Sequence, residues 1–381
     1  MAMRSERNAV WRRESYLIES SSSSARDMPE LAHEAANSDS DIKTHDAAEN
    51  LQPGNGLWKD PSAVFERKTS DDKRVIMPDG ETVVFRNFSD PTSDSVDGSL
   101  TSPIIRVREG QQAQIKLETR EFKRRSTVVA QGIGARSQMR SAGLCTETVA
   151  SHTYQWQPRS AGTWFYQSHA SSPHQFEMGL YGVIVVDAEP DHNGRPRAYH
   201  NGPTYDIERI WVFDDVDPSW HSDDAAEQAA NNGRLTSFKP KYFLINGVPN
   251  TETLHHPDVA IEAKLGDTLL LRLMNASFSL VKVQIERLNV DIISVDGQAL
   301  GSEERPWTHW ISVAPQQPVR LATASRHDLL INLDPTLSGF EGPGEYRVTI
   351  EFLDGARRQV QNTDASHPAH VGRATTTIRV L

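Results

Sequence analysis

The chain has one cysteine and no long apolar run. With Cys145 alone, no disulfide can form within the chain. No segment approaches the roughly 18 consecutive apolar residues that a membrane-spanning helix needs, so the sequence predicts no membrane span. The 51 acidic residues outnumber the 40 basic ones and give a net charge of −11. This excess argues against nucleic acid or an anionic membrane as a partner.

Common catalytic motifs are also missing. The chain has no G-x-S-x-G, no glycine-rich phosphate loop, no H-E-x-x-H and no C-x-x-C. The first residues carry charge but lack the apolar region of a secretory signal. We therefore expect a cytoplasmic protein, or a periplasmic or secreted one if the sequence lacks a natural leader.

Composition and patterning divide the chain into a polar start and a β-rich remainder. Residues 1–57 are rich in Ser, Asp, Glu, Ala and Asn and have few aromatics, which predicts a disordered tail. Short apolar or alternating runs between turn residues then predict an all-β fold of two Greek-key sandwich domains, at 58–190 and 207–381, with a linker at 191–206. The strands expected in the first domain are 74–77, 82–88, 104–107, 113–117, 127–130, 153–157, 163–168 and 182–187.

Residues 162–186, GTWFYQSHASSPHQFEMGLYGVIVV, are the most informative stretch. They resemble the segment that closes the first domain of multicopper oxidases, which reads G-T-x-W-Y-H-S-H, then a loop and G-L-x-G. In that family both histidines bind copper. Here Gln167 replaces the first and His169 keeps the second.

The upstream ligand strand of the family is altered in the same sense. Residues 126–132, STVVAQG, stand where the family has T-T-I-H-W-H-G, so that Val129 and Gln131 replace two histidines. Side chains at i and i+2 of a strand share a face, which lets an H-x-H pair serve one metal cluster. The resemblance therefore implies that three of the four expected copper ligands of this domain are missing.

Other segments extend the resemblance in the family's order. The family has two cupredoxin domains here and a third that carries an H-C-H segment for blue copper. We find no counterpart of that third domain, and Cys145 has no histidine beside it, so no blue copper site is expected. The further matching segments are PIIRVREGQ (103–111), YFLING (242–247), LRLMNAS (271–277), VDGQ (295–298) and SRHDLL (325–330).

Five residues are candidates for a site. The resemblance implies that Gln131, Gln167 and His169 line the altered copper cavity and point inward, and His169 could still bind a metal or be only a hydrogen-bonded relic. His174 and Met178 could share one face of a helical turn capped by Ser172, with Pro173 first. An imidazole and a thioether suit Cu(I), but these two side chains could equally pack in the core.

We interpret the chain as a multicopper-oxidase-like cupredoxin protein that has lost most copper ligands and acts as a non-oxidase binding or scaffold protein. No cofactor is expected, although copper is possible. Its partner could be another protein, a second copy of the chain or a small-molecule ligand. Two alternatives remain: an enzyme that reuses the copper cavity for a small organic substrate, or a redox subunit completed by a partner that carries the third domain.

Overall fold

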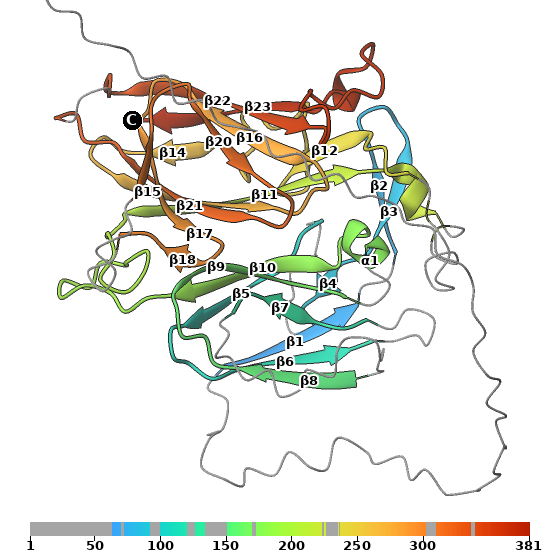
Figure 1. Cartoon of the computed structure of the whole chain (residues 1–381), viewed down its shortest axis with the longest axis horizontal. Coiled ribbons are helices and arrows are strands. Elements are labelled where there is room, and N and C mark those ends of the chain that lie inside the picture. Colours follow the sequence, from blue (N-terminus) through green and yellow to red (C-terminus); the bar gives the residue numbers. More distant parts are fainter. Residues whose placement is uncertain are drawn as a thin grey trace, which may run out of the picture. The chain divides into compact units, whose positions relative to one another are not determined.

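The strands of this protein form four main sheets and a separate hairpin, as the computed structural model shows (Figure 1). The all-β cupredoxin fold predicted from the sequence is confirmed. The predicted tail, residues 1–57, lies outside the described residues. The structure describes residues 63–69, 72–91, 100–119, 126–133, 151–169, 173–222, 225, 235, 237–301, 310–336 and 340–381.

The first sandwich consists of two four-stranded sheets. One has the order β4-β1-β6-β8 and the other the order β5-β10-β9-β7. Its core contains the alternate apolar residues of both sheets, which is the pattern that predicted a sandwich. The strands are β1 (Ala63–Thr69), β4 (Phe88–Ser89), β5 (Ser102–Arg108), β6 (Ala113–Glu118), β7 (Val129–Gln131), β8 (Ser151–Trp156), β9 (Gly162–Gln167) and β10 (Tyr181–Asp187).

Strand β1 is absent from the sequence-based prediction. It pairs in parallel with β6, but Glu66, Arg67 and Lys68 interrupt its apolar alternation. Arg67 is nevertheless buried, because its Nη1 lies 3.1 Å from a carboxylate oxygen of Asp90. Only the folded chain brings this partner close, so the strand pattern is hidden in the sequence.

The second sandwich pairs an eight-stranded sheet with a five-stranded one. The first has the order β13-β12-β11-β15-β21-β17-β18, with β19 paired to β17, and the second has the order β14-β23-β22-β16-β20. The strands are β11 (Ile207–Val216), β12 (Tyr242–Ile245), β13 (Val248–Pro249), β14 (Ile261–Ala263), β15 (Thr268–Asn275), β16 (Leu280–Ile285), β17 (Val290–Val295), β18 (Gln298–Ala299), β19 (Ile311–Val313), β20 (Pro318–Leu321), β21 (Arg326–Asn332), β22 (Gly344–Leu353) and β23 (Arg373–Val380).

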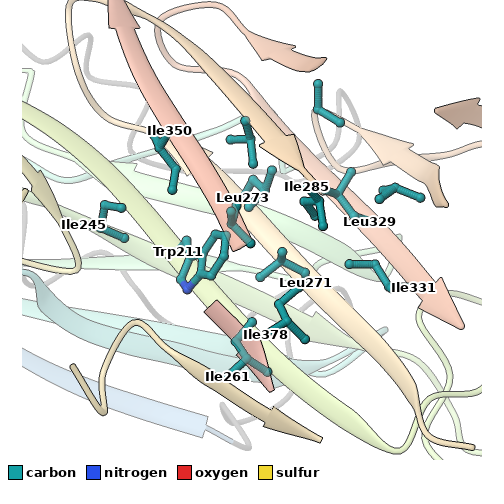
Figure 2. Packing of buried hydrophobic residues seen from close by; sticks show 14 of the residues in the cluster. Trp211, Ile245, Ile261, Leu271, Leu273, Ile285, Leu329, Ile331, Ile350 and Ile378 are labelled. Carbon is teal, nitrogen blue, oxygen red and sulfur yellow. The ribbon is translucent and has the colours of Figure 1, made fainter. Parts of the chain in front are cut away.

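The core of the second sandwich surrounds Trp211. Figure 2 shows its indole beside Leu271, Leu273 and Ile378, which come from both sheets. The indole N–H donates to the carbonyl of Val259 at 2.9 Å, so the buried polar atom is satisfied. Burial of each Leu or Ile side chain in this core contributes roughly 1.5–3 kcal/mol to the free energy of unfolding.

The eight-stranded sheet is buried on both faces, and β15 shows why. Leu269, Leu271 and Leu273 point into the core of the second sandwich. The residues between them face the first sandwich, where Met274 joins a cluster with Phe165 of β9. This strand therefore reads as a continuous apolar run rather than an alternation.

Arg272 lies on the same face of β15, at the junction of the two sandwiches, and is completely buried. Its Nη1 lies 3.1 Å from Asp328 of β21, and its Nε lies 2.7 Å from Glu208 of β11. Nη1 also donates to the hydroxyl of Thr163 on β9, which in turn donates to Asp328. A buried cation of this kind needs such partners, since desolvation of an isolated charge is very costly.

A hairpin from the first half of the chain also contacts the second sandwich. It comprises β2 (Lys73–Ile76) and β3 (Thr82–Phe85). Its apolar side chains pack against Tyr242 and Leu244. At its turn, Asp79 accepts a hydrogen bond from Tyr242 and lies 2.8 Å from His370 Nε2.

Residues 53–381 form one compact unit, which agrees with this shared interface. The division into domains at 58–190 and 207–381, joined by a linker at 191–206, remains a proposal. Among the described helices, none is long and apolar enough to cross a membrane.

We predict that Asp328→Asn lowers the free energy of unfolding by roughly 3–5 kcal/mol, because it removes one charge of a buried pair and leaves Arg272 undercompensated. Urea denaturation at neutral pH measures the change. The exposed pair between Arg379 and Glu262 provides the control, and Glu262→Gln should cost at most about 1 kcal/mol. Equal effects of the two substitutions would contradict the importance given to the buried network.

Candidate functional site

The two segments that resemble copper-ligand motifs lie side by side. Strand β7 pairs with β9 in antiparallel register, with Val129 opposite Gln167 and Gln131 opposite Phe165. Directly opposed residues of an antiparallel pair project to the same face. In this register the aliphatic side chain of Val129 faces the carboxamide of Gln167.

Gln167 and His169 differ in exposure. Gln167 is buried, with 7% of its surface exposed, whereas His169 is exposed. The expectation that His169 points into a shared cavity remains a prediction. The His169 backbone N–H donates to the Thr127 hydroxyl at 3.0 Å, which fixes the chain just after β9 while the imidazole remains at the surface. The side chain of Gln131 lies outside what the structure describes.

A short helix, α1 (His174–Glu177), follows this segment, with Pro173 at its N-cap. The expectation that Pro173 occupies the first helical position is wrong by one residue; Ser172 lies outside the described residues. His174 Nε2 lies 2.9 Å from the carbonyl of Trp220, and Met178 is 2% exposed. Both side chains are buried, which favours packing in the core over metal binding.

The residues described at this site do not fit a copper ion. Copper needs three or four imidazole, thiolate or thioether donors directed at one point. Val129 has no donor atom, Gln167 has a neutral carboxamide, and His169 supplies a single imidazole. Within the described ranges, no three His, Cys, Asp or Glu side chains gather in a group that could hold a metal.

A buried polar junction lies next to α1, and sequence analysis missed it. Glu177 accepts the backbone N–H of Asp217 at 2.9 Å, and the same oxygen lies 3.2 Å from His221 Nε2. His221 belongs to the 3-10 helix η2 (Pro218–His221), which follows β11. Burial raises the pKa of Glu177 well above its usual range, and the charge of Asp215 raises it further.

Two more carboxyl groups of β11 belong to this junction. Asp214 accepts the hydroxyl proton of Tyr181 at 2.6 Å, and burial followed by the charge of Glu177 raises the Asp214 pKa. Burial also raises the pKa of Asp215 to about 6, although this carboxylate accepts the backbone N–H groups of Phe278 and Ser279. The neighbouring acidic pair in the sequence Phe213-Asp214-Asp215-Val216 was the only available signal.

Two pockets are found among the described residues, and Tyr181 lines the smaller one. The larger, of about 750 Å³, runs along the segment after β10 and is lined by Arg106, Asp187 and Tyr205 among others. The smaller, of about 200 Å³, lies between β10 and β11 and is lined by Ile104, Val183 and further residues. Among their described linings, neither pocket includes Gln167 or His169. The predicted grouping of Gln131, Gln167 and His169 around one pocket therefore remains a prediction.

Comparison with known sequences agrees with the segments singled out above. Residues 82–191 match the family model described as multicopper oxidase. A copper resistance protein A homologue of Pseudomonas syringae pv. tomato is 26% identical over 188 residues, which cover 47% of this chain and 29% of the relative. Copper resistance protein A of Escherichia coli is 30% identical over 125 residues, which cover 32% of this chain and 20% of the relative. The chain thus spans less than a third of the length of either relative.

Solved structures show the same fold. Blue copper oxidase from Nitrosomonas europaea superimposes with a TM-score of 0.59 at 18% identity, covering 84% of this chain and 86% of the other. The copper nitrite reductase of the same organism gives 0.56 at 18% identity, covering 84% and 93%. At this identity the likeness concerns the fold alone.

We predict that His174→Gln alters the acid side of the stability profile. Burial lowers the pKa of His174 to about 4. Between about pH 6.5 and 4, His174 is therefore protonated in the unfolded chain but neutral in the folded protein. Stability from this group is therefore present above pH 6.5 and lost as the pH falls through about 4. Relative to the variant, the unfolding equilibrium constant of the wild type should rise up to tenfold per pH unit over this window.

Thermal and urea unfolding between pH 4 and 7 measure this difference, which cancels the contributions of the other titrating groups. His255 is exposed, so His255→Gln is the matched control and should leave the profile unchanged. A wild type and a His174→Gln variant with parallel profiles would contradict the prediction.

Proposed function

Because the chain belongs to the multicopper oxidase family, we propose that it is a non-oxidase binding or scaffold protein built on the family's cupredoxin sandwiches. The proposal separates the fold from the copper chemistry. The two relatives are named for copper resistance. For this chain to bind copper in the same way, it would need histidines where it has Val129, Gln131 and Gln167.

The register between β7 and β9 carries the proposal. Val129 stands directly opposite Gln167, at two positions where the family motifs place copper-binding imidazoles. The strands remain paired, so a sliding register does not explain the exchange. Two metal-binding side chains have been replaced within an intact sheet.

The replacements favour a neutral or hydrated surface over a divalent cation. A carboxamide offers one acceptor oxygen and two donor hydrogens and carries no charge. An aliphatic side chain offers no lone pair. Neither supplies what an ion such as copper needs after it leaves water. His169 then remains as one exposed imidazole, which is too few donors for a copper site.

We propose that this fold acts by binding through its surface. The two sandwiches share a buried interface, so they present fixed surfaces to a partner. A protein partner, a second copy of this chain or a small molecule are the classes of ligand that we propose. Copper remains possible as a weakly bound ion.

We predict that the wild-type chain retains less than about one equivalent of copper after loading and dialysis, and that Val129→His, Gln131→His and Gln167→His together raise the retained copper. Three added imidazoles with His169 restore the donor set of the family motifs. Metal analysis by mass spectrometry, after loading with Cu(I) or Cu(II), measures the stoichiometry.

The matched control replaces the same three positions by alanine, which removes the side chains without adding donors. This variant should retain no more copper than the wild type. Tight retention of two or more copper ions by the wild type, unchanged in the histidine variant, would contradict the proposal and place the ligands elsewhere.

A further inference from the structure

His221 is fixed in one orientation by two contacts. Its Nδ1 lies 2.6 Å from the carbonyl oxygen of Val84 on β3. A carbonyl can only accept, so Nδ1 carries a proton. The ring also packs edge-on against Phe85, with ring centroids 4.9 Å apart. These contacts direct Nε2 towards Glu177.

Glu177 uses one oxygen for two contacts. Oε1 accepts the backbone N–H of Asp217 at 2.9 Å and lies 3.2 Å from His221 Nε2. In a neutral ring whose Nδ1 is protonated, Nε2 has only a lone pair. A carboxylate oxygen has only lone pairs as well, so this contact requires a proton between the two atoms. Both side chains are 1% exposed, so water does not screen the interaction between Glu177 and His221.

We propose that Glu177 and His221 share one buried proton that fastens α1, η2 and β3 together, and that raising the pH opens this junction by removing the proton. The pair joins all three segments, and α1 and η2 are also linked by the contact of His174 with the Trp220 carbonyl. The inference rests on this geometry and holds whether or not the chain binds copper.

The surroundings disfavour an ionised Glu177. Its second oxygen, Oε2, is buried and has no hydrogen-bond partner, so a negative charge there would remain unsatisfied. Among the described groups that face the pair, the one cation is Arg86, whose Nε lies 2.7 Å from Asp72. The titratable and charged groups facing the pair are His174 on α1, Tyr181 on β10, Asp214 and Asp215 on β11, Asp217 before η2, and Arg86 after β3.

The proton resides on the carboxyl group. Burial raises the pKa of Glu177 and lowers the pKa of His221 to about 4. Both shifts favour a neutral acid that donates to a neutral imidazole over a buried ion pair. An acid hydroxyl can donate to Nε2 while its oxygen accepts from Asp217, which is the double use that the distances record.

Loss of the proton would loosen the polar contacts of α1 with η2 and β3, while Phe176 of α1 stays packed in the apolar cluster with Met274. Helix α1 lies in the segment between β9 and β10, whereas η2 directly follows β11. The hairpin of β2 and β3 is held at the same point through Val84. The state of one proton therefore affects the contacts of α1 with both the β2–β3 hairpin and the second sandwich.

Glu177→Gln tests the shared proton. An amide atom either donates or accepts, so glutamine cannot replace both contacts of Oε1, and it cannot titrate. A carboxyl group with a raised folded-state pKa stabilises the fold fully below its unfolded pKa, and this stability is lost as the pH rises through the folded pKa. Between about pH 5 and 10, the unfolding equilibrium constant of the wild type, divided by that of Glu177→Gln, should rise about tenfold per pH unit until Glu177 ionises.

Glu351→Gln is the matched control. Glu351 lies on β22 beside Lys282 and Arg373, and hydrogen bonds from these cations outweigh burial and lower its pKa. Titration of Glu351 therefore affects stability only below about pH 4.5. The unfolding equilibrium constant of the wild type, divided by that of Glu351→Gln, should not change with pH above pH 5. A flat ratio for Glu177→Gln as well would overturn the proposal.

Hydrogen exchange of the wild-type protein provides a test that does not depend on a variant that folds. After correction for the intrinsic pH dependence of exchange, amides of α1, η2 and β3 should lose protection together, by up to about tenfold per pH unit. Amides of β22 and β23 should not change. Protection that is independent of pH, or that changes in only one of the three segments, would overturn the proposal.

Discussion

The buried guanidinium of Arg272 is the constraint on which the arrangement of the two sandwiches depends. It lies on the face of β15 that contacts the first sandwich, and its partners come from β9, β11 and β21. Because a buried charge without partners is strongly destabilising, only a few placements of the sandwiches satisfy it. The apolar cluster around Phe165 and Met274 supplies the attraction, while the ion pair fixes the position.

The contacts that hold the fold are therefore separate from the strands that resemble copper-ligand motifs. The core around Trp211 and the network around Arg272 use no residue of the family's copper motifs. Val129 and Gln167 belong to neither of these groups. The pairing of β7 with β9 therefore does not need metal-binding side chains at these two positions.

Much of the fold could be predicted, because strand patterns and family segments are local features of the sequence. Strands β9 and β10 lie within a residue of their expected limits. What escaped prediction depends on contacts between distant residues. The pattern of strand β1 is interrupted by Arg67, whose buried partner Asp90 is distant in the sequence. Glu177 has the residue type of a surface position, and only its contacts with Asp217 and His221 in the fold show that it is buried. The exposure of His169 follows from how the chain leaves β9 after Ser168, which no motif encodes.

The most direct measurement is anomalous diffraction at the copper edge from crystals soaked with copper. We propose that the chain keeps the fold but has no copper-binding face on β7 and β9. The account predicts no anomalous peak between Val129 and Gln167, where β7 and β9 meet. A strong peak there, with nitrogen ligands from this chain, would contradict it.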